Sequence, residues 1–298
     1  MQNKTHNTKI WLPASLDEMK SLGWTQPDVV LITGDAYIDH PSFGIAVIAR
    51  VLEAEGYKVA IIAQPNWRDD LRDFKKFGQP RLFFGISGGN MDSMVNHYTA
   101  RKRLRSDDAY TPGDRSGFRP DYAATVYTKM VKQLYPETPV ILGGIEASMR
   151  RLTHYDYWSE TLKPSVLVDS GADILVYGMG EKAIIEIAHQ IDKKNDLKNE
   201  RIPQTAIIAD EKPGLEYILL PSHEDCLKSK TQFGKHFVLI EENSNRLKAK
   251  GLIEPIKDKF VIVHPPYAPT STEELDAIYA LPFTRLPHPR YNKKPPIP

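Results

Sequence analysis

Residues 29–56 read VVLITGDAYIDHPSFGIAVIARVLEAEG, and this stretch decides the fold class. Val29–Thr33 is a short run of apolar and β-branched residues, which is typical of a buried parallel strand. From Ser42 to Glu55 the apolar residues return at helical spacing, and Gly56 follows where a left-handed C-terminal cap favours glycine. The stretch therefore predicts a strand, a loop and a helix, the first half of a βαβ unit.

The same alternation continues to residue 192. Four more short apolar runs predict strands, at Val59–Ala63, Leu82–Ile86, Val140–Leu142 and Ile174–Tyr177. Amphipathic stretches predict helices at Tyr122–Leu134 and Lys182–Asp192. Because the strands are apolar on both faces, helices must cover both sides of the sheet. The sequence thus predicts an α/β fold with a doubly wound, Rossmann-like parallel sheet and right-handed crossovers.

The chain divides into four predicted parts: an N-terminal extension over 1–27, the Rossmann-like domain over 28–200, an irregular α/β extension over 201–280, and a proline-rich linker over 281–298. In the third part, Thr205–Ala209 is expected to pair with Tyr217–Leu220 across a turn at Pro213-Gly214. Ser222 is expected to cap a long helix running toward Lys250, and Phe260–Val263 to form a strand. The six prolines of 281–298 exclude a regular helix or a central strand there.

Composition excludes several classes of protein. The 39 Lys and Arg residues balance 38 Asp and Glu residues, so net charge gives no case for nucleic acid as a partner. The basic run Arg101–Arg105 is interpreted as neutralised by Asp107, Asp108 and Asp114. No apolar run approaches the roughly 18 residues of a membrane span, and the polar residues 1–9 lack the apolar stretch expected of a signal peptide. A single cysteine, Cys226, excludes an internal disulfide and a cysteine-based metal site, and favours a cytoplasmic protein.

The loops that follow the predicted strands are rich in glycine and small polar residues. In an open α/β sheet, ligands bind outside the carboxyl ends of the strands, where such loops let backbone amides approach closely. We therefore predict a binding site for a small-molecule cofactor or substrate. Its residues are Asp39, His40 and Pro41 after the first strand, Ser87, Gly88, Gly89 and Asn90 after the third, Gly143, Gly144 and Glu146 after the fourth, and Gly178, Gly180 and Glu181 after the fifth.

Single residues of this set have structural alternatives. His40 could bind a metal or cofactor, or it could cap the following helix, and Asp39 has the same two options. Glu146 and Glu181 fall in first helical turns, where the helix dipole favours a carboxylate without any ligand. None of the loops matches the G-x-G-x-x-G fingerprint or the phosphate-binding P-loop. We predict no catalytic residue and no metal-ligand set in this chain.

Five strings of the sequence resemble the N-terminal domain of the YgiQ family, a group of uncharacterised radical S-adenosylmethionine proteins. They are Gly85-Ile-Ser-Gly-Gly-Asn-Met-Asp92, Tyr110–Asp121, Ile141–Arg151, Asp173–Glu181 and Leu281–Arg290, and the resemblance extends over nearly the whole chain. It implies that the following segment of an intact protein carries a C-x3-C-x2-C motif, whose thiolates hold a four-iron–four-sulfur cluster that cleaves S-adenosylmethionine. Those cysteines are absent here.

Residues 28–192 also resemble the cobalamin-binding type of Rossmann domain found ahead of many radical SAM barrels. The resemblance rests on Gly143-Gly144 and Gly178-Met-Gly-Glu181. Cobalamin domains with a histidine ligand carry D-x-H-x-x-G, whereas this sequence has Ile38 and Phe43 at the aspartate and glycine positions around His40. The resemblance therefore leaves cobalamin open as a cofactor.

Together these features predict an accessory domain of a radical SAM enzyme, with the barrel domain of the same polypeptide as its partner. Two alternatives stay open. One is a stand-alone glycosyl- or nucleotidyl-transferase that uses Asp39, Glu146 or Glu181. The other is an interaction module that uses the polar loop 100–120 and the aromatic segment 154–158.

Overall fold

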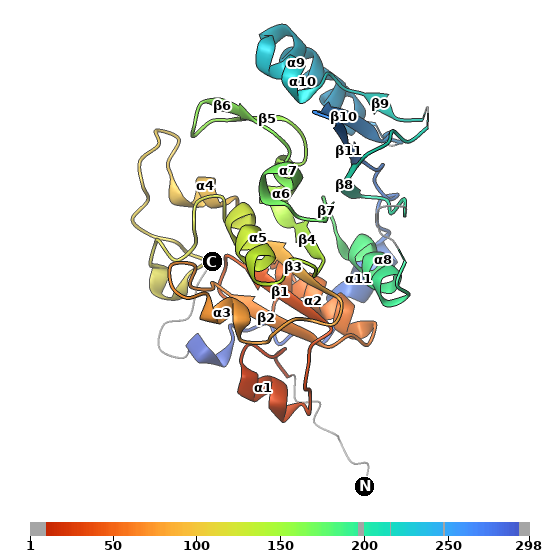
Figure 1. Cartoon of the computed structure of the whole chain (residues 1–298). Helices are drawn as coiled ribbons and strands as arrows, with labels where there is room; N and C mark the ends of the chain where they lie inside the picture. Colours follow the sequence, from red (N-terminus) through yellow and green to blue (C-terminus); the bar gives the residue numbers. More distant parts are fainter. Residues whose placement is uncertain (1–9, 196–199, 215, 247, 292–298) are drawn as a thin grey trace.

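The computed structural model describes residues 10–195, 200–214, 216–246 and 248–291. One nine-stranded sheet runs through the molecule in the order β2-β1-β3-β4-β7-β8-β11-β10-β9, and helices flank it (Figure 1). No helix among the described residues is long and apolar enough to cross a membrane.

Five parallel strands form the first half of this sheet. They are β1 (Val29–Thr33), β2 (Val59–Ala63), β3 (Phe83–Ser87), β4 (Val140–Gly143) and β7 (Ile174–Val176). Their order, β2-β1-β3-β4-β7, and their parallel pairing confirm the predicted doubly wound fold. The chain reverses its direction of winding between β1 and β3, so the topological switch point lies at the carboxyl ends of these two strands.

Helices cover both faces of the parallel strands. The long helices α2 (Gly44–Ala54) and α8 (Glu181–Asp192) pack on one face, and α3 (Arg72–Lys75), α5 (Ala123–Leu134) and α7 (Val166–Ser170) pack on the other. In β1, Val29 and Leu31 belong to the first core cluster, whereas Val30 and Ile32 belong to the second. Successive side chains of a strand point to opposite faces, which is why a strand buried on both sides is an unbroken apolar run.

The second half of the sheet is mostly antiparallel. It contains β8 (Thr205–Ala209), β11 (Lys259–Val263), β10 (Leu252–Ile256) and the short edge strand β9 (Ile218–Leu219). The prediction that the β8 and β9 segments pair with each other is wrong, because β8 inserts between β7 and β11. The backbone groups on both edges of β8 are thereby hydrogen-bonded. One sheet therefore contains strands from both sides of the predicted boundary at residue 200.

Ser222 caps a helix as predicted, but the helix is short. Its Oγ accepts a hydrogen bond from the Asp225 amide at the start of α9 (His223–Lys228). Ser229 then adopts an extended conformation and caps a second helix, α10 (Lys230–Ser244), so the prediction of one continuous helix is wrong. A serine that can bond the backbone of the next turn favours such a break.

Several short elements complete the fold. They are α1 (Leu16–Ser21), α4 (Ser93–His97), α6 (Gly144–Met149), α11 (Thr272–Tyr279), the hairpin of β5 (His154–Asp156) and β6 (Thr161–Lys163), and the 3-10 turns η1 (Pro112–Asp114) and η2 (Pro289–Tyr291).

The described part of the proline-rich segment, residues 281–291, packs against the loop after β1. Phe283 is fully buried, and the Thr284 amide donates to the Asp39 carboxylate at 2.8 Å. Pro287 forms an isolated bridge with Ile38, and the His288 amide donates to the Tyr37 carbonyl. Residues 292–298 of the predicted linker lie outside the described residues.

Candidate functional site

A cavity of about 330 Å³ opens at the carboxyl ends of β1, β3, β4 and β7, beneath the N-termini of α2 and α8. Apolar side chains make its floor, including Leu31, Ile48, Ile141, Val176 and Ile184. Its size falls within the range of small-molecule sites. The cavity thus lies where the sheet topology places ligands in this class of fold.

Nine of the thirteen predicted site residues line this cavity. They are Pro41, Ser87, Gly89, Asn90, Gly143, Gly144, Gly178, Gly180 and Glu181. These residues come from four separate loops, so the predicted convergence of glycine-bearing turns at one edge of the sheet is present. Their role in binding stays a prediction.

The glycines allow the loops after β3 and β4 to approach closely. Gly89 has φ +119°, and a Cβ atom at this position would lie 2.3 Å from Asp35 Oδ1. Gly144 has φ +81°, and its Cβ would lie 2.5 Å from Ser87 Oγ. No L side chain fits either position without moving its neighbour, so glycine is required by conformation and by space.

Two helix N-termini face the mouth of the cavity, at Gly44 and Glu181. The Asn90 side chain accepts the Gly44 amide of α2 at 3.3 Å, whereas no side chain of the described residues caps the first turn of α8. The first amide groups of a helix lack intrahelical partners and carry a partial positive charge. The mouth of the cavity therefore offers hydrogen-bond donors above an apolar floor.

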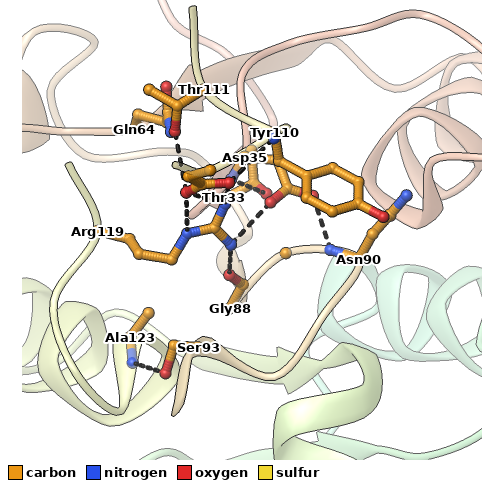
Figure 2. A network of polar contacts seen from close by, with 12 residues as sticks. Thr33, Asp35, Gln64, Gly88, Asn90, Ser93, Tyr110, Thr111, Arg119 and Ala123 are labelled. Atoms are coloured by element: carbon orange, nitrogen blue, oxygen red, sulfur yellow. Dashed lines mark hydrogen bonds and ion pairs between the residues drawn. The ribbon is translucent and has the colours of Figure 1, made fainter. Parts of the chain in front are cut away.

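A buried ion network holds the loops around the switch point (Figure 2). Arg119 Nη1 lies 2.8 Å from Asp35 Oδ1, and Arg119 Nη2 lies 2.9 Å from Asp108 Oδ2. Arg119 also donates to the Gly88 carbonyl, and Asp35 Oδ2 accepts the Asn90 amide at 2.7 Å. Burial alone would lower the pKa of Arg119, but the two carboxylates outweigh it and raise this pKa. The guanidinium is permanently charged and fixes three loops at once.

The sequence pattern did not predict a role at the switch point for Asp35, Asp108 or Arg119. Their signal was weak, because an aspartate after a strand and charges in a long polar segment are ordinary features of loops. The stretch 100–120 is a long polar loop, and loops of this length are often functional. In the structure, Asp108 and Arg119 of this loop are buried and paired at the switch point.

Asp39 and His40 do not line the cavity. Asp39 is fully buried, and its carboxylate accepts from Arg50 and from the Thr284 amide. His40 Nδ1 accepts a hydrogen bond from the Ser42 amide at 3.1 Å and lies 2.6 Å from Ser42 Oγ. His40 thus orders the turn between β1 and α2, and Asp39 ties this turn to Arg50 and to the segment 281–291.

Glu146 and Gly88 also lie beside the cavity rather than in it. The buried Glu146 carboxylate accepts the Ser93 and Ala124 amides, each at 2.8 Å, and so joins the N-termini of α4 and α5. A Cβ at Gly88 would lie 2.5 Å from Glu146 Oε2. Gly88 therefore leaves the space that this carboxylate occupies.

The carboxylates of the transferase alternative do not converge, since only Glu181 of Asp39, Glu146 and Glu181 reaches the cavity. Within the described ranges, no group of three or more His, Cys, Asp and Glu side chains could hold a metal ion.

A second cleft of about 240 Å³ adjoins the cavity and shares Gly178, Met179 and Glu181 with it. Gln204 and Tyr267 line its far side.

Comparison with known proteins supports a family relationship. The family model described as Radical SAM N-terminal matches residues 11–298. A UPF0313 protein of Bacteroides thetaiotaomicron is 54% identical over 98% of the chain and 49% of its own length. UPF0313 proteins of Porphyromonas gingivalis and Thermotoga neapolitana are 53% and 47% identical, over 98% and 95% of the chain and 47% and 50% of their own lengths. The chain spans about half the length of these relatives.

One solved structure is also similar, the radical S-adenosylmethionine methyltransferase TsrM from Kitasatospora setae with a tryptophan substrate and a SAM analogue bound. The two chains share 20% sequence identity with a TM-score of 0.41, over 60% of this chain and 28% of that one.

Proposed function

Because the chain belongs to the Radical SAM N-terminal family, we propose that it is an accessory domain that binds a cofactor or substrate at the carboxyl edge of its parallel sheet. The cavity bounded by β1, β3, β4 and β7 carries this proposal. The four-iron–four-sulfur cluster of the intact enzyme would be bound elsewhere, because a cluster needs several thiolates and this chain has one cysteine.

The lining of the cavity indicates the kind of ligand. The floor is aliphatic, and glycine backbones form part of the walls, so a flat apolar group fits between the strands and α2. Amide groups at the start of α8 would receive a polar or anionic group of the same ligand. Among the described residues that line the cavity, Glu181 is the one carboxylate, and it would orient a hydrogen-bond donor.

Cobalamin meets this description in part. The apolar, glycine-walled cavity suits a heteroaromatic group of the cofactor. His40 does not suit the role of axial ligand, because its Nδ1 accepts the Ser42 amide and neutral imidazole then carries its proton on Nε2. Histidines that bind metal usually donate a hydrogen bond through their other ring nitrogen. Cobalamin would therefore bind here without a bond from His40 to cobalt.

The mouth of the cavity also offers a surface for the rest of the enzyme. Ile145 and Met149 lie in α6 and Met179 lies in the loop after β7, and all three are 46–51% exposed. Large exposed apolar side chains grouped at one edge are typical of an interface. We infer that the second half of the longer relatives, expected to be the radical SAM barrel, covers this edge and encloses the ligand.

A titration tests the proposal. The chain is mixed with hydroxocobalamin or with S-adenosylmethionine, and thermal shift and visible spectra report binding. A Gly143→Leu variant should lose the response, since a Cβ at Gly143 meets only the Val176 carbonyl, at 3.9 Å, and the longer side chain would fill the cavity. Gly234→Leu, on the exposed face of α10, is the matched control. A response that survives in Gly143→Leu would place the ligand outside the cavity, and no response to either cofactor would leave only a substrate as ligand.

A further inference from the structure

The basic run Arg101–Arg105 lies on a hairpin, which we define as residues 97–105 and call the arginine hairpin. The Thr99 amide donates to the Arg103 carbonyl, and the Arg105 amide donates to the His97 carbonyl, both at 2.8 Å. Lys102 sits at the tip with φ +58°. Arg103 and Arg105 are two residues apart in this ladder, so they project from the same side.

The charges of the arginine hairpin are not neutralised as the sequence suggested. Asp108, which the sequence predicted to neutralise this run, is paired instead with the buried Arg119. Within the described part of the chain, Arg101, Arg103 and Arg105 have no acidic side chain at ion-pair distance. Lys102 of this hairpin is paired with Glu160, and His97 lies 2.7 Å from Asp121. A cluster of exposed guanidinium groups therefore remains on a protein whose net charge is +1.

Further cations and aromatic rings continue the surface beside the hairpin. Asp107, two residues after it, forms an isolated antiparallel backbone β-bridge with Arg115. The Arg115 guanidinium packs over the Phe118 ring at 4.7 Å. Arg68 donates to the Gly117 carbonyl and packs over the Trp67 ring at 4.4 Å. Arg68 and Arg115 thus each pack over an aromatic ring, and Arg68 contacts the loop that carries Arg115.

On the other side, the arginine hairpin contacts the aromatic end of the β5–β6 hairpin. Tyr157 donates its hydroxyl to the Ala100 carbonyl at 2.6 Å, and Lys102 packs over the Tyr157 ring. Tyr155 and Tyr157 are 52% and 48% exposed. The ring of Trp158 lies 5.2 Å from that of Tyr157. Flat, partly exposed rings therefore stand next to exposed arginines.

We propose that this surface binds single-stranded nucleic acid. Arginine is the side chain best suited to phosphate, which it can bind through two parallel hydrogen bonds. Exposed tyrosine rings are platforms on which unpaired bases stack, whereas a duplex keeps its bases inside. The combination favours RNA or DNA with accessible bases over a duplex, and the proposal does not depend on the ligand of the cavity.

Fluorescence anisotropy of the full chain with a fluorescein-labelled 20-nucleotide single-stranded RNA tests this surface. The expected result is binding that weakens steeply with salt and is stronger than binding to duplex DNA of the same length. R101E/R103E/R105E should weaken binding about 10-fold or more. K228E/K230E/K235E makes the same charge change at exposed lysines of α9 and α10, and should stay within about 2-fold of wild type.

The aromatic contribution needs its own variant. Y155A/Y157A should lower affinity for the single strand about 5-fold or more, while binding to the duplex changes little. The proposal is overturned by an absence of binding at low salt, by equal losses in the two charge variants, or by equal affinity for single strand and duplex. Binding to phosphatidylserine vesicles without binding to RNA would also overturn it and assign the surface to a membrane. Cofactor titrations of R101E/R103E/R105E should match wild type, which separates this test from that of the cavity.

Discussion

Arg119 Nη1 lies 2.8 Å from Asp35 Oδ1, and both side chains are buried at the switch point of the sheet. The pair joins the loop after β1 to the segment that leads into α5. The other oxygen of the Asp35 carboxylate accepts the Asn90 amide, so the same side chain also holds the loop after β3, which lines the cavity. A hydrogen-bonded ion network at this point gives the loops a rigid geometry without any ligand.

Arg119→Met should destabilise the fold by about 3–5 kcal/mol, because Asp35 and Asp108 would remain buried without their cation. Arg119→Lys should recover only part of this loss, since lysine cannot reproduce the fork that contacts both carboxylates. Urea unfolding measures both values. Arg68→Met, at an exposed arginine, serves as the control and should change stability by less than about 0.5 kcal/mol. An equally stable Arg119→Met variant would contradict the structural role of the network.

Gly89→Ala should destabilise the chain by about 2–4 kcal/mol, because it adds a Cβ at a positive φ and against Asp35 Oδ1. The Gly234→Ala change in the middle of α10 should instead be neutral or stabilising by up to about 1 kcal/mol. Unfolding in urea distinguishes the two. If Gly89→Ala were as stable as wild type, the close approach of Gly89, in the loop after β3, to Asp35, in the loop after β1, would be incorrect.

Asp39→Ala should lower stability by about 2–4 kcal/mol, since Arg50 would lose one of its two acidic partners in a buried setting. It should also speed tryptic cleavage at Arg285 and Arg290, because the Asp39 carboxylate accepts the Thr284 amide and holds residues 281–291 in place. Glu181→Gln, at a residue of the cavity, should leave both properties unchanged. Faster cleavage in Glu181→Gln but not in Asp39→Ala would contradict this assignment.

How much of this arrangement could be predicted is clearest at Asp39 and Glu146. Their positions after β1 and β4 followed from the strand pattern, and the convergence of the loops followed from the parallel sheet. Whether each carboxylate faces the cavity or the protein depended on partners distant in sequence, such as Thr284 for Asp39 and Ala124 for Glu146. Local pattern holds no information on such pairs. The insertion of β8 between β7 and β11 was missed for the same reason, because nearness in sequence favoured a hairpin.

His264 should make the stability of the fold dependent on pH. Burial lowers the pKa of His264 to about 4, below the 6.5 of an exposed histidine. As pH falls from about 6.5 to 4, the unfolded chain takes up the proton first, and up to about 1.4 kcal/mol of stability is lost per pH unit. A His264→Asn variant lacks this effect, so its stability difference from wild type should shrink as the pH is lowered through this window. A difference that stays constant from pH 7 to pH 4 would show that His264 titrates normally.

Methyl NMR tests the binding cavity most directly. With isoleucine δ1 methyl groups labelled, a bound cofactor or substrate should shift the signals of Ile48, Ile141 and Ile184, which line the cavity, and leave those of Ile253 and Ile256 in β10 unchanged. The same ligand should produce no such shifts in Gly143→Leu. Shifts at β10 with unchanged signals from the cavity would contradict a binding site at the carboxyl edge of the parallel sheet.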